Sequence, residues 1–217
     1  MTFDLFANQA PALPPVEHMA EGAVLLRQFA NPYEADILTA LRQVVDISPF
    51  RHLVTPGGYQ MSVAMTNCGK AGWVSDRTGY RYDPVDPMTQ QPWPAMPQAF
   101  LTLAQQAAKQ AGYADFTPDV CLMNRYLPAS KLSLHQDKDE QDLHHPIVSV
   151  SLGLPAVFQF GGLSRQDKIT KYPLHHSDVV VWGGASRLYY HGILPLKEGE
   201  HPIFRRSRIN LTFRKAL

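Results

Sequence analysis

Hydrophobic and polar residues alternate along much of the second half of the chain. Between residues 148 and 154, aliphatic side chains alternate with Ser or Gly, which is the period of a β-strand with two different faces. Further strands are predicted at 157–160, 178–182 and 208–213. The uncharged run 146–163 is interrupted by Pro155 and several polar residues, so it predicts paired strands rather than a membrane span. Short strands between Gly and Pro turns favour a sandwich or jelly roll.

Helical spacing of apolar residues predicts two amphipathic helices in the first half of the chain. One begins at Asn31, an N-cap type residue followed by Pro and then Glu at the third helical position. The other spans 97–111, and Gly112 is placed to end it. Residues 50–95 are rich in Gly, Pro, Thr, Tyr and Met and predict short strands and loops. The first 20 residues, rich in Pro and Ala without periodicity, predict a flexible or loosely packed arm.

Composition limits the classes of protein to which the chain can belong. With 217 residues and 45% hydrophobic residues, it can bury the core of one domain, or of one domain with a lid. The formal net charge of +1 argues against a polyelectrolyte-type nucleic-acid binder, so any anion-binding surface depends on a few well-placed cations. Two cysteines without metal or redox spacing, and no secretory pattern in the first 15 residues, predict a cytoplasmic protein. No hydrophobic stripe demands a partner, so we expect a monomer.

Two His-x-Asp motifs are candidates for a metal site. His135 and Asp137 lie two positions apart, which places both on one face of a strand. His176 and Asp178 have the same spacing, but Asp178 stands at the start of an apolar strand, where a turn-capping role explains it. His191 follows the first pair at a separation that lets the chain cross a small sandwich and return, whereas it follows the second pair closely. We therefore favour the first pair, with His191 as the third ligand.

Two imidazoles and one carboxylate leave coordination positions open, as in mononuclear iron(II) oxygenases. Catalytic zinc with a bound water accepts the same ligands, so they do not decide between oxidation and hydrolysis. The C-terminal strand adds a second observation, because Arg208, Asn210, Thr212 and Arg214 alternate with apolar residues and share one face. Two guanidinium groups on one face suit a dicarboxylate. This pattern favours an oxygenase with a dicarboxylate cosubstrate.

Several motifs distributed over nearly the whole chain are shared with one family. They are Thr55-Pro56-Gly57-Gly58-Tyr59, Met61-Ser62-Val63-Ala64-Met65, Pro92-Trp93-Pro94-Ala95-Met96-Pro97, Asn124-Arg125-Tyr126, Leu132-Ser133-Leu134-His135-Gln136-Asp137-Lys138-Asp139, Trp182-Gly183-Gly184, His191-Gly192-Ile193 and Asn210-Leu211-Thr212-Phe213-Arg214. Together they closely resemble the AlkB family of iron(II)- and 2-oxoglutarate-dependent dioxygenases.

The resemblance implies a mainly β protein of the α+β class with flanking helices, built as a double-stranded β-helix (jelly roll) with an N-terminal nucleotide-recognition lid. The expected parts are an arm at 1–20, a helix and lid at 21–95, and a catalytic core at 96–217. By analogy, His135, Asp137 and His191 bind Fe(II). Arg208, Tyr126 and Asn210 would hold the distal carboxylate of 2-oxoglutarate, and Arg214 and Asn124 the carboxylate beside its keto group.

The resemblance also implies the substrate and the reaction. Trp73 would stack on a damaged base against the ring of His135, and Asp139 would face its exocyclic nitrogen. Tyr80 and Lys131 would lie near backbone phosphates. Met65, Leu122, Glu140 and Arg165 would complete the pocket. The implied reaction uses dioxygen and 2-oxoglutarate to hydroxylate the methyl group of a base such as 1-methyladenine or 3-methylcytosine, releasing formaldehyde and succinate.

The expected partner is alkylated single-stranded DNA, with double-stranded DNA and RNA as further candidates, because a lesion that cannot pair is easier to extract. Two alternatives stay open from the sequence. One is the same iron chemistry on a protein or a free nucleotide. The other is a non-catalytic single-strand nucleic-acid binding module with a structural metal.

Overall fold

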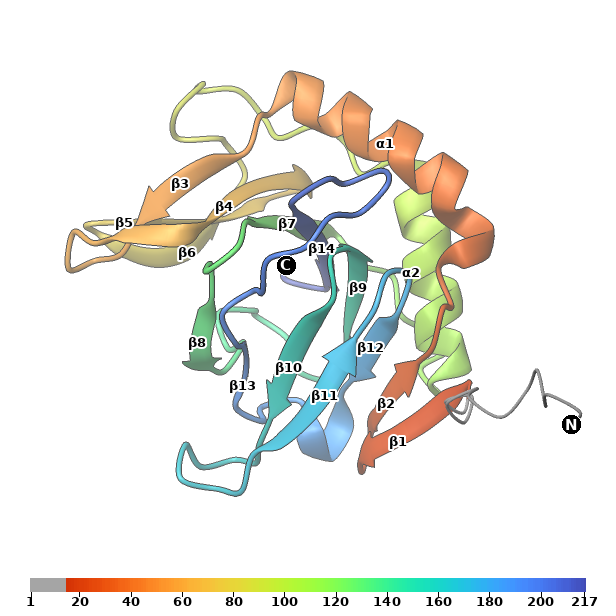
Figure 1. The fold of residues 1–217 in the computed structure, drawn as a ribbon. Coiled ribbons are helices and arrows are strands. Elements are labelled where there is room, and N and C mark those ends of the chain that lie inside the picture. The colour runs from red at the N-terminus through yellow and green to blue at the C-terminus, as the bar shows by residue number, and fades with distance from the viewer. Residues whose placement is uncertain (1–14) are drawn as a thin grey trace, which may run out of the picture.

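Two antiparallel sheets face each other in a computed structural model that describes residues 15–217 (Figure 1). In spatial order the larger sheet contains β1 (Val16–Ala20), β2 (Ala23–Leu26), β12 (Val179–Trp182), β9 (Ile147–Gly153), β14 (Arg208–Arg214), β7 (Val120–Tyr126), β4 (Gln60–Gly69) and β3 (Arg51–Val54). The smaller sheet contains β11 (Thr170–Leu174), β10 (Ala156–Phe160), β13 (His191–Ile193) and β8 (Leu132–His135). This arrangement is a jelly roll, and the predicted fold class is confirmed.

The larger sheet lies between two cores, and its central strands β2, β12, β9 and β14 are buried on both faces. Helices α1 (Glu34–Ile47) and α2 (Gln98–Gln110) lie along its outer face. Phe100 of α2 meets Phe213 of β14 edge to face, with ring centroids 5.9 Å apart. The alternate residues of β14, beginning with Arg208, line a cavity on the inner face. One strand thus presents apolar side chains to the helices and polar side chains to the interior of the sandwich.

The start of the first helix differs from the prediction. Asn31 does not cap it, since residues Asn31–Tyr33 form a 3-10 turn (η1) that leads into α1 without a side-chain cap. Pro32 fits this turn because its fixed φ angle suits the first residues of a helix. The second helix agrees with the prediction, and Gly112, with φ of +92°, follows it in a conformation that favours glycine.

Two expectations for the chain path are wrong. Residues 16–20 form strand β1, paired with β2, rather than part of a flexible arm. The rest of that arm, up to residue 14, lies outside the described residues. The run 146–163 does form two strands, but β9 and β10 belong to opposite sheets instead of pairing with each other. Gly153, with φ of +89°, precedes the connection that carries the chain from one sheet to the other, a crossing common in jelly rolls.

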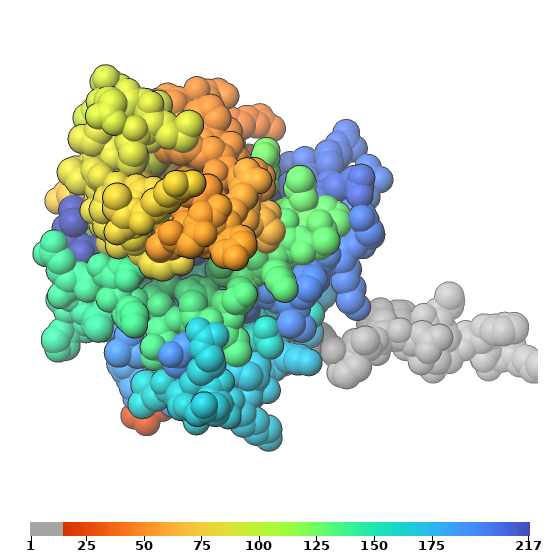
Figure 2. Space-filling model, turned by 90° about the vertical axis from the view of Figure 1, so that its left-hand side faces the viewer, coloured from red at the N-terminus to blue at the C-terminus, as the bar shows by residue number. Residues whose placement is uncertain are grey.

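A third, two-stranded sheet of β5 (Gly72–Asp76) and β6 (Gly79–Asp83) contributes to the wall of the cavity. In Figure 2 this hairpin and the neighbouring β3–β4 segment, in yellow and orange, lie over the green and cyan segments of the core. Among residues 15–217, no helix has the length and apolar character needed to cross a membrane.

Candidate metal centre and active site

A cavity of about 710 Å³ lies between the two sheets and reaches the β5–β6 hairpin. Every side chain that the sequence singled out for the site lines it: Met65, Trp73, Tyr80, Leu122, Asn124, Tyr126, Lys131, His135, Asp137, Asp139, Glu140, Arg165, His191, Arg208, Asn210 and Arg214. These residues come from seven strands and from the loops between them. The fold therefore assembles in one place residues that are far apart in the sequence.

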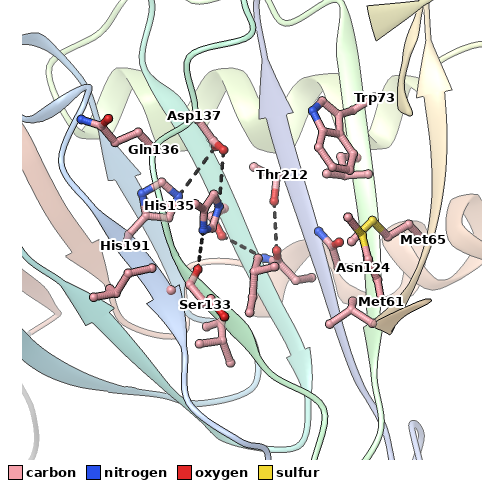
Figure 3. Close-up of a pocket in the computed structure, with 18 of the residues that line it drawn as sticks. Met61, Met65, Trp73, Asn124, Ser133, His135, Gln136, Asp137, His191 and Thr212 are labelled. Carbon is pink, nitrogen blue, oxygen red and sulfur yellow. Dashed lines mark hydrogen bonds and ion pairs between the residues drawn. The ribbon is translucent and has the colours of Figure 1, made fainter. Parts of the chain in front are cut away.

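Three potential metal ligands converge at one end of this cavity (Figure 3). His135 ends β8 and His191 begins β13, and the two residues are direct partners across the antiparallel pair. Asp137 follows two positions after His135, in a loop. The Nε2 atoms of His135 and His191 lie 3.5 and 3.8 Å from the nearest carboxylate oxygens of Asp137. Potential ligand atoms of all three lie within 4.8 Å of one another, so a single ion can contact all three residues.

Both imidazoles are oriented by a backbone carbonyl two residues earlier in the chain. His135 Nδ1 lies 2.8 Å from the carbonyl oxygen of Ser133, and His191 Nδ1 lies 2.9 Å from that of Tyr189. A carbonyl oxygen only accepts hydrogen bonds, so each Nδ1 carries the proton and each Nε2 offers a lone pair. This is the second contact that metal-binding histidines commonly make. The arrangement suits iron(II), and zinc would accept the same ligands.

Electrostatics keep the carboxylate charged and one imidazole neutral. Burial raises the pKa of Asp137, but the charge of Arg214 and the adjacent His135 outweigh it and hold this pKa well below its usual range. Burial and the adjacent His135 lower the pKa of His191 to about 3. For His135, burial acts to lower the pKa, while the adjacent Asp137 carboxylate raises it, and the net shift is upward. The site thus favours an ionised Asp137 and a neutral His191.

The second His-x-Asp motif is fully engaged elsewhere. Asp178 pairs with Arg27 at 2.9 Å and accepts hydrogen bonds from two backbone N–H groups. His176 accepts a hydrogen bond from the Gly153 N–H and contacts Glu34 at 3.1 Å through its other ring nitrogen. Both side chains therefore connect structural elements, in agreement with the choice of the first motif.

Arg208 is a buried cation with unused donors. It is only 1% exposed, and its Nη2 donates to the Ser151 hydroxyl at 2.9 Å. Its Nε and Nη1 have no partner among residues 15–217. The guanidinium stacks on the ring of Tyr126, 5.0 Å from the centroid. Burial lowers the pKa of Arg208. Because unpaired buried donors are costly, the site is built for an anionic ligand that would satisfy them.

A second arginine with an unused donor lies beside Asp137. Arg214 donates to Asp137 at 2.6 and 3.0 Å, yet its Nη1 has no partner among the described residues, and neither has Asn124 Oδ1. Asn210 is oriented by donating to Ser149 and by accepting from Thr212. Two guanidinium groups on one strand face, each with a free donor, fit a molecule with a carboxylate at each end.

The wall formed by the β5–β6 hairpin carries aromatic rings and a carboxylate. Trp73 stacks on Tyr80, with ring centroids 5.4 Å apart and an angle of 14° between the planes. Its indole N–H donates to Asp139 at 2.9 Å. Arg165 lies over the ring of Tyr190 at 5.1 Å. Figure 3 shows Trp73 and Met65 across the cavity from the three candidate metal ligands.

Glu140 is placed differently from the other predicted substrate residues. Its carboxylate is buried and accepts a hydrogen bond from the Tyr82 hydroxyl at 2.7 Å and another from Arg187 at 3.0 Å. It also pairs with Arg214 at 3.2 Å. Both oxygens of Glu140 are therefore occupied by the protein.

Sequence reasoning missed Ser149, Ser151, Tyr82 and Arg187 as contributors to the site. The two serines were recognised as the polar positions of an alternating strand, and that polar face lies towards the ligand-binding residues of β14. This alternation was the signal available for finding them. Arg187 is 3% exposed and gives no sequence signal, because its partners lie in a distant loop.

The comparisons with known proteins agree with this geometry. A model of the 2OG-Fe(II) oxygenase superfamily matches residues 22–214. The chain is 61% identical to the alpha-ketoglutarate-dependent dioxygenase AlkB of Escherichia coli, over 98% of this chain and 97% of that protein. It is 60% identical to the Salmonella typhimurium protein of the same name, with the same coverage. The solved structure of OsALKBH1 superposes with a TM-score of 0.80 at 30% identity, covering 93% of this chain and all of that one.

The resemblance found in the sequence is thereby confirmed, and the chain is an enzyme rather than a non-catalytic binding module. Its cofactor is iron(II), and its cosubstrate is 2-oxoglutarate, also called alpha-ketoglutarate. The chain belongs to the AlkB family of iron(II)- and 2-oxoglutarate-dependent dioxygenases.

Proposed function

We propose that this enzyme oxidatively removes methyl groups from damaged nucleic-acid bases, with 1-methyladenine and 3-methylcytosine in single-stranded DNA as substrates, and with double-stranded DNA and RNA as further ones. The observation that carries this proposal is that Trp73 and Asp139 line the same cavity as the metal ligands and Arg208. Two distant relatives support the substrate class, since they are named a DNA N(6)-methyladenine demethylase in Arabidopsis thaliana and a nucleic acid dioxygenase in Homo sapiens.

We assign the metal to His135, Asp137 and His191. Iron(II) held there would supply the redox chemistry that couples the decarboxylation of 2-oxoglutarate to the hydroxylation of a methyl group. Arg208, with Tyr126 and Asn210, would bind the distal carboxylate of the cosubstrate. Arg214 and Asn124 would bind the carboxylate beside its keto group. The unpaired donors of both arginines support this division.

We assign base recognition to the opposite wall. The Trp73 indole and the His135 imidazole would enclose the flat base between them, and Asp139 would accept from its exocyclic nitrogen. Methylation at N1 of adenine or N3 of cytosine leaves a positive charge, so a carboxylate favours the lesion electrostatically. Lys131 and Tyr80 would lie near phosphates.

Met65, Leu122, Glu140 and Arg165 would complete the pocket around the base. We further propose that, within residues 21–95, the β5–β6 hairpin with β3 acts as the nucleotide-recognition lid over a core formed by 96–217. Once hydroxylated, the methyl group leaves as formaldehyde and the base is restored.

The test is to incubate the protein with iron(II), ascorbate and a single-stranded oligonucleotide containing 1-methyladenine, with and without 2-oxoglutarate, and to identify the product by mass spectrometry. We expect demethylation only when 2-oxoglutarate is present. His135→Ala and Arg208→Ala should abolish it while circular dichroism shows a retained fold. His176→Asn, which changes the other His-x-Asp motif, is the matched control and should remain active.

Two results would contradict the proposal in different ways. Succinate formation without demethylation would retain the oxygenase site but move the search to another substrate, such as a protein or a free nucleotide. Undiminished turnover in both His135→Ala and Arg208→Ala would reject the assigned site.

A further inference from the structure

Asp137 lies in a segment without regular secondary structure, which raises the question of what holds it in place. Residues 136–146 contain no strand or helix, although they carry Asp137, Asp139 and Glu140. Loops of this kind are usually the most mobile parts of a fold. A metal ligand nevertheless needs an orientation fixed to a fraction of an ångström. The segment must therefore be held by contacts from outside it.

Arg187 supplies three of these contacts. It follows the short 3-10 turn η2 (Gly184–Ser186), and each of its three guanidinium nitrogens donates to a different oxygen of the segment. Nη1 donates to the backbone carbonyl of Asp137 at 2.7 Å, Nη2 to the carboxylate of Glu140 at 3.0 Å, and Nε to the carbonyl of His145 at 3.0 Å. A planar guanidinium with all nitrogens engaged fixes the relative positions of its acceptors.

The location of Arg187 separates it from the ligand-binding residues. Its side chain is 4% exposed and it does not line the cavity. It therefore has no direct contact with a ligand in the cavity and acts through its acceptors. Through Glu140 it also reaches Arg214, because Glu140 pairs with Arg214 at 3.2 Å and Arg214 binds Asp137 at 2.6 Å. Asp137 is thus held through its backbone by Arg187 and through its side chain by Arg214.

The same short stretch of chain carries the other half of the metal site. Four residues after Arg187 comes His191, and the carbonyl of Tyr189 between them accepts the Nδ1 proton of His191. The carbonyl of Leu188 accepts a hydrogen bond from Gln136 at 2.6 Å. Residues 187–191 are therefore joined to the Asp137 loop on both sides of the ligand.

We infer that Arg187 is a positioning residue for the metal centre, which sets the distance between Asp137 and His191 by holding the 137–145 loop to the segment that carries His191. This inference rests on the metal site proposed above. Partners of this kind around metal ligands typically contribute about 10- to 100-fold to metal affinity.

The experiment measures manganese(II) binding by the metal-free full-length protein, with free Mn(II) detected by electron paramagnetic resonance. Arg187→Lys retains the charge but replaces three fixed donors with one flexible ammonium group. We expect it to weaken Mn(II) binding about tenfold or more. Arg27→Lys is the matched control, because the Arg27 side chain is also largely buried, at 8% exposed, and pairs with Glu17 and Asp178 but does not line the cavity. It should bind Mn(II) within about twofold of the wild type while losing thermal stability, because a buried charge pair is disturbed.

A second variant covers the case in which Arg187→Lys does not fold. Arg187→Met combined with Glu140→Gln removes both charges of the pair together, and Arg214, which loses Glu140, keeps Asp137 as its partner. It should fold and still bind Mn(II) weakly, because the Asp137 carbonyl has lost its donor. Wild-type affinity in either variant, or an equal loss in Arg27→Lys, would overturn the inference. Failure of both variants to fold would assign Arg187 to stability alone. Failure of the wild type to bind Mn(II) would instead overturn the metal site itself.

Discussion

Asp139 is already engaged before a base arrives, since it accepts the indole N–H of Trp73. Trp73 would contact the flat face of the base, and Asp139 would interact with its positive charge. These two residues are therefore already joined by a hydrogen bond in the free enzyme. Substrate binding must either retain this hydrogen bond or exchange it for one to the base. Asp139 needs only an oxygen atom to accept the Trp73 hydrogen bond, whereas it needs its negative charge to attract a cationic base. A substitution can therefore separate the contribution of the hydrogen bond from that of the charge.

Asp139→Asn separates them, because the amide oxygen still accepts from Trp73 while the charge is lost. We expect the kcat/KM for 1-methyladenine, a cationic base, to fall about tenfold, since hydrogen bonds to charged groups are worth about 1.5–3 kcal/mol. The neutral lesion 3-methylthymine should change much less. Steady-state rates on oligonucleotides containing either lesion measure the effect. An equal loss for both lesions would show that Asp139 acts by shape alone.

At the scale of single elements, the β5–β6 hairpin depends on its turn. A two-stranded sheet has little stability of its own, and here Asp76 closes the turn. It accepts a hydrogen bond from the Thr78 N–H at 2.8 Å and pairs with Arg81 at 2.9 Å. The hydrogen bonds from the Thr78 side chain and from Arg81 lower the pKa of Asp76 to about 2.

The sign of this shift fixes its pH dependence. The folded pKa lies below the ordinary value of 3.8, so Asp76 stabilises the turn fully above that value and loses its effect as the pH falls towards about 2. An NMR titration of the carboxyl carbon should give a midpoint near this lower value. A midpoint near 3.8 would show that the turn does not hold Asp76 in solution.

Asp76→Ala should loosen the hairpin that carries Trp73 and Tyr80. We expect the KM for the oligonucleotide to rise several-fold, because the side-chain contacts that close the turn are lost, with the KM for 2-oxoglutarate unchanged. The exposed Asp115 provides the control substitution Asp115→Ala. A rise in both KM values would mean that the hairpin also shapes the cosubstrate site.

The elements differ in how well the sequence predicts them. Strands β9 and β14 are seven residues long, and their alternation is visible directly in the sequence. Strand β13 has three residues and β8 has four, too few to show a period, although both carry proposed metal ligands. The local sequence pattern also does not show that β9 and β10 belong to opposite sheets, because this depends on how the two sheets pack together.

Site residues show a related division. The alternating pattern of β14 predicted that Arg208 and Arg214 share one face of the strand, and the structure places both in the cavity. Arg187 could not be predicted in this way, because a lone arginine near a turn is usually solvent-exposed. Only the approach of the 137–145 loop, far away in the sequence, explains its burial.

At the scale of the whole molecule, the larger sheet lies between two cores, and only the core between the sheets borders the cavity. The core on the helix side contains Phe100, and the core between the sheets contains Phe158, whose ring centroid lies 5.9 Å from that of His191. Phe158 lines the cavity, whereas Phe100 does not. A substitution in the helix-side core should therefore affect stability alone, whereas one in the core between the sheets should affect both stability and cosubstrate binding.

We expect Phe100→Ala to lower the free energy of unfolding by about 3–5 kcal/mol, as is usual for a buried aromatic ring, without changing the KM for 2-oxoglutarate by more than about twofold. Phe158→Ala should lower stability and also raise that KM. Denaturant unfolding and steady-state kinetics on both variants provide the comparison. A raised KM in Phe100→Ala would show that the sheet transmits changes from the helix layer to the site.

The unpaired donors of Arg208 also affect the stability of the folded protein. A buried guanidinium without an anionic partner is a charge that the empty protein carries at a cost, and a dicarboxylate that binds only the folded state reduces that cost. Binding and folding are then linked by mass action, so that a ligand at about 100 times its dissociation constant adds about 2.7 kcal/mol to stability. The persistence of the folded enzyme in a cell would in this way follow the supply of a central metabolite, and a shortage of 2-oxoglutarate would reduce the amount of enzyme as well as its rate.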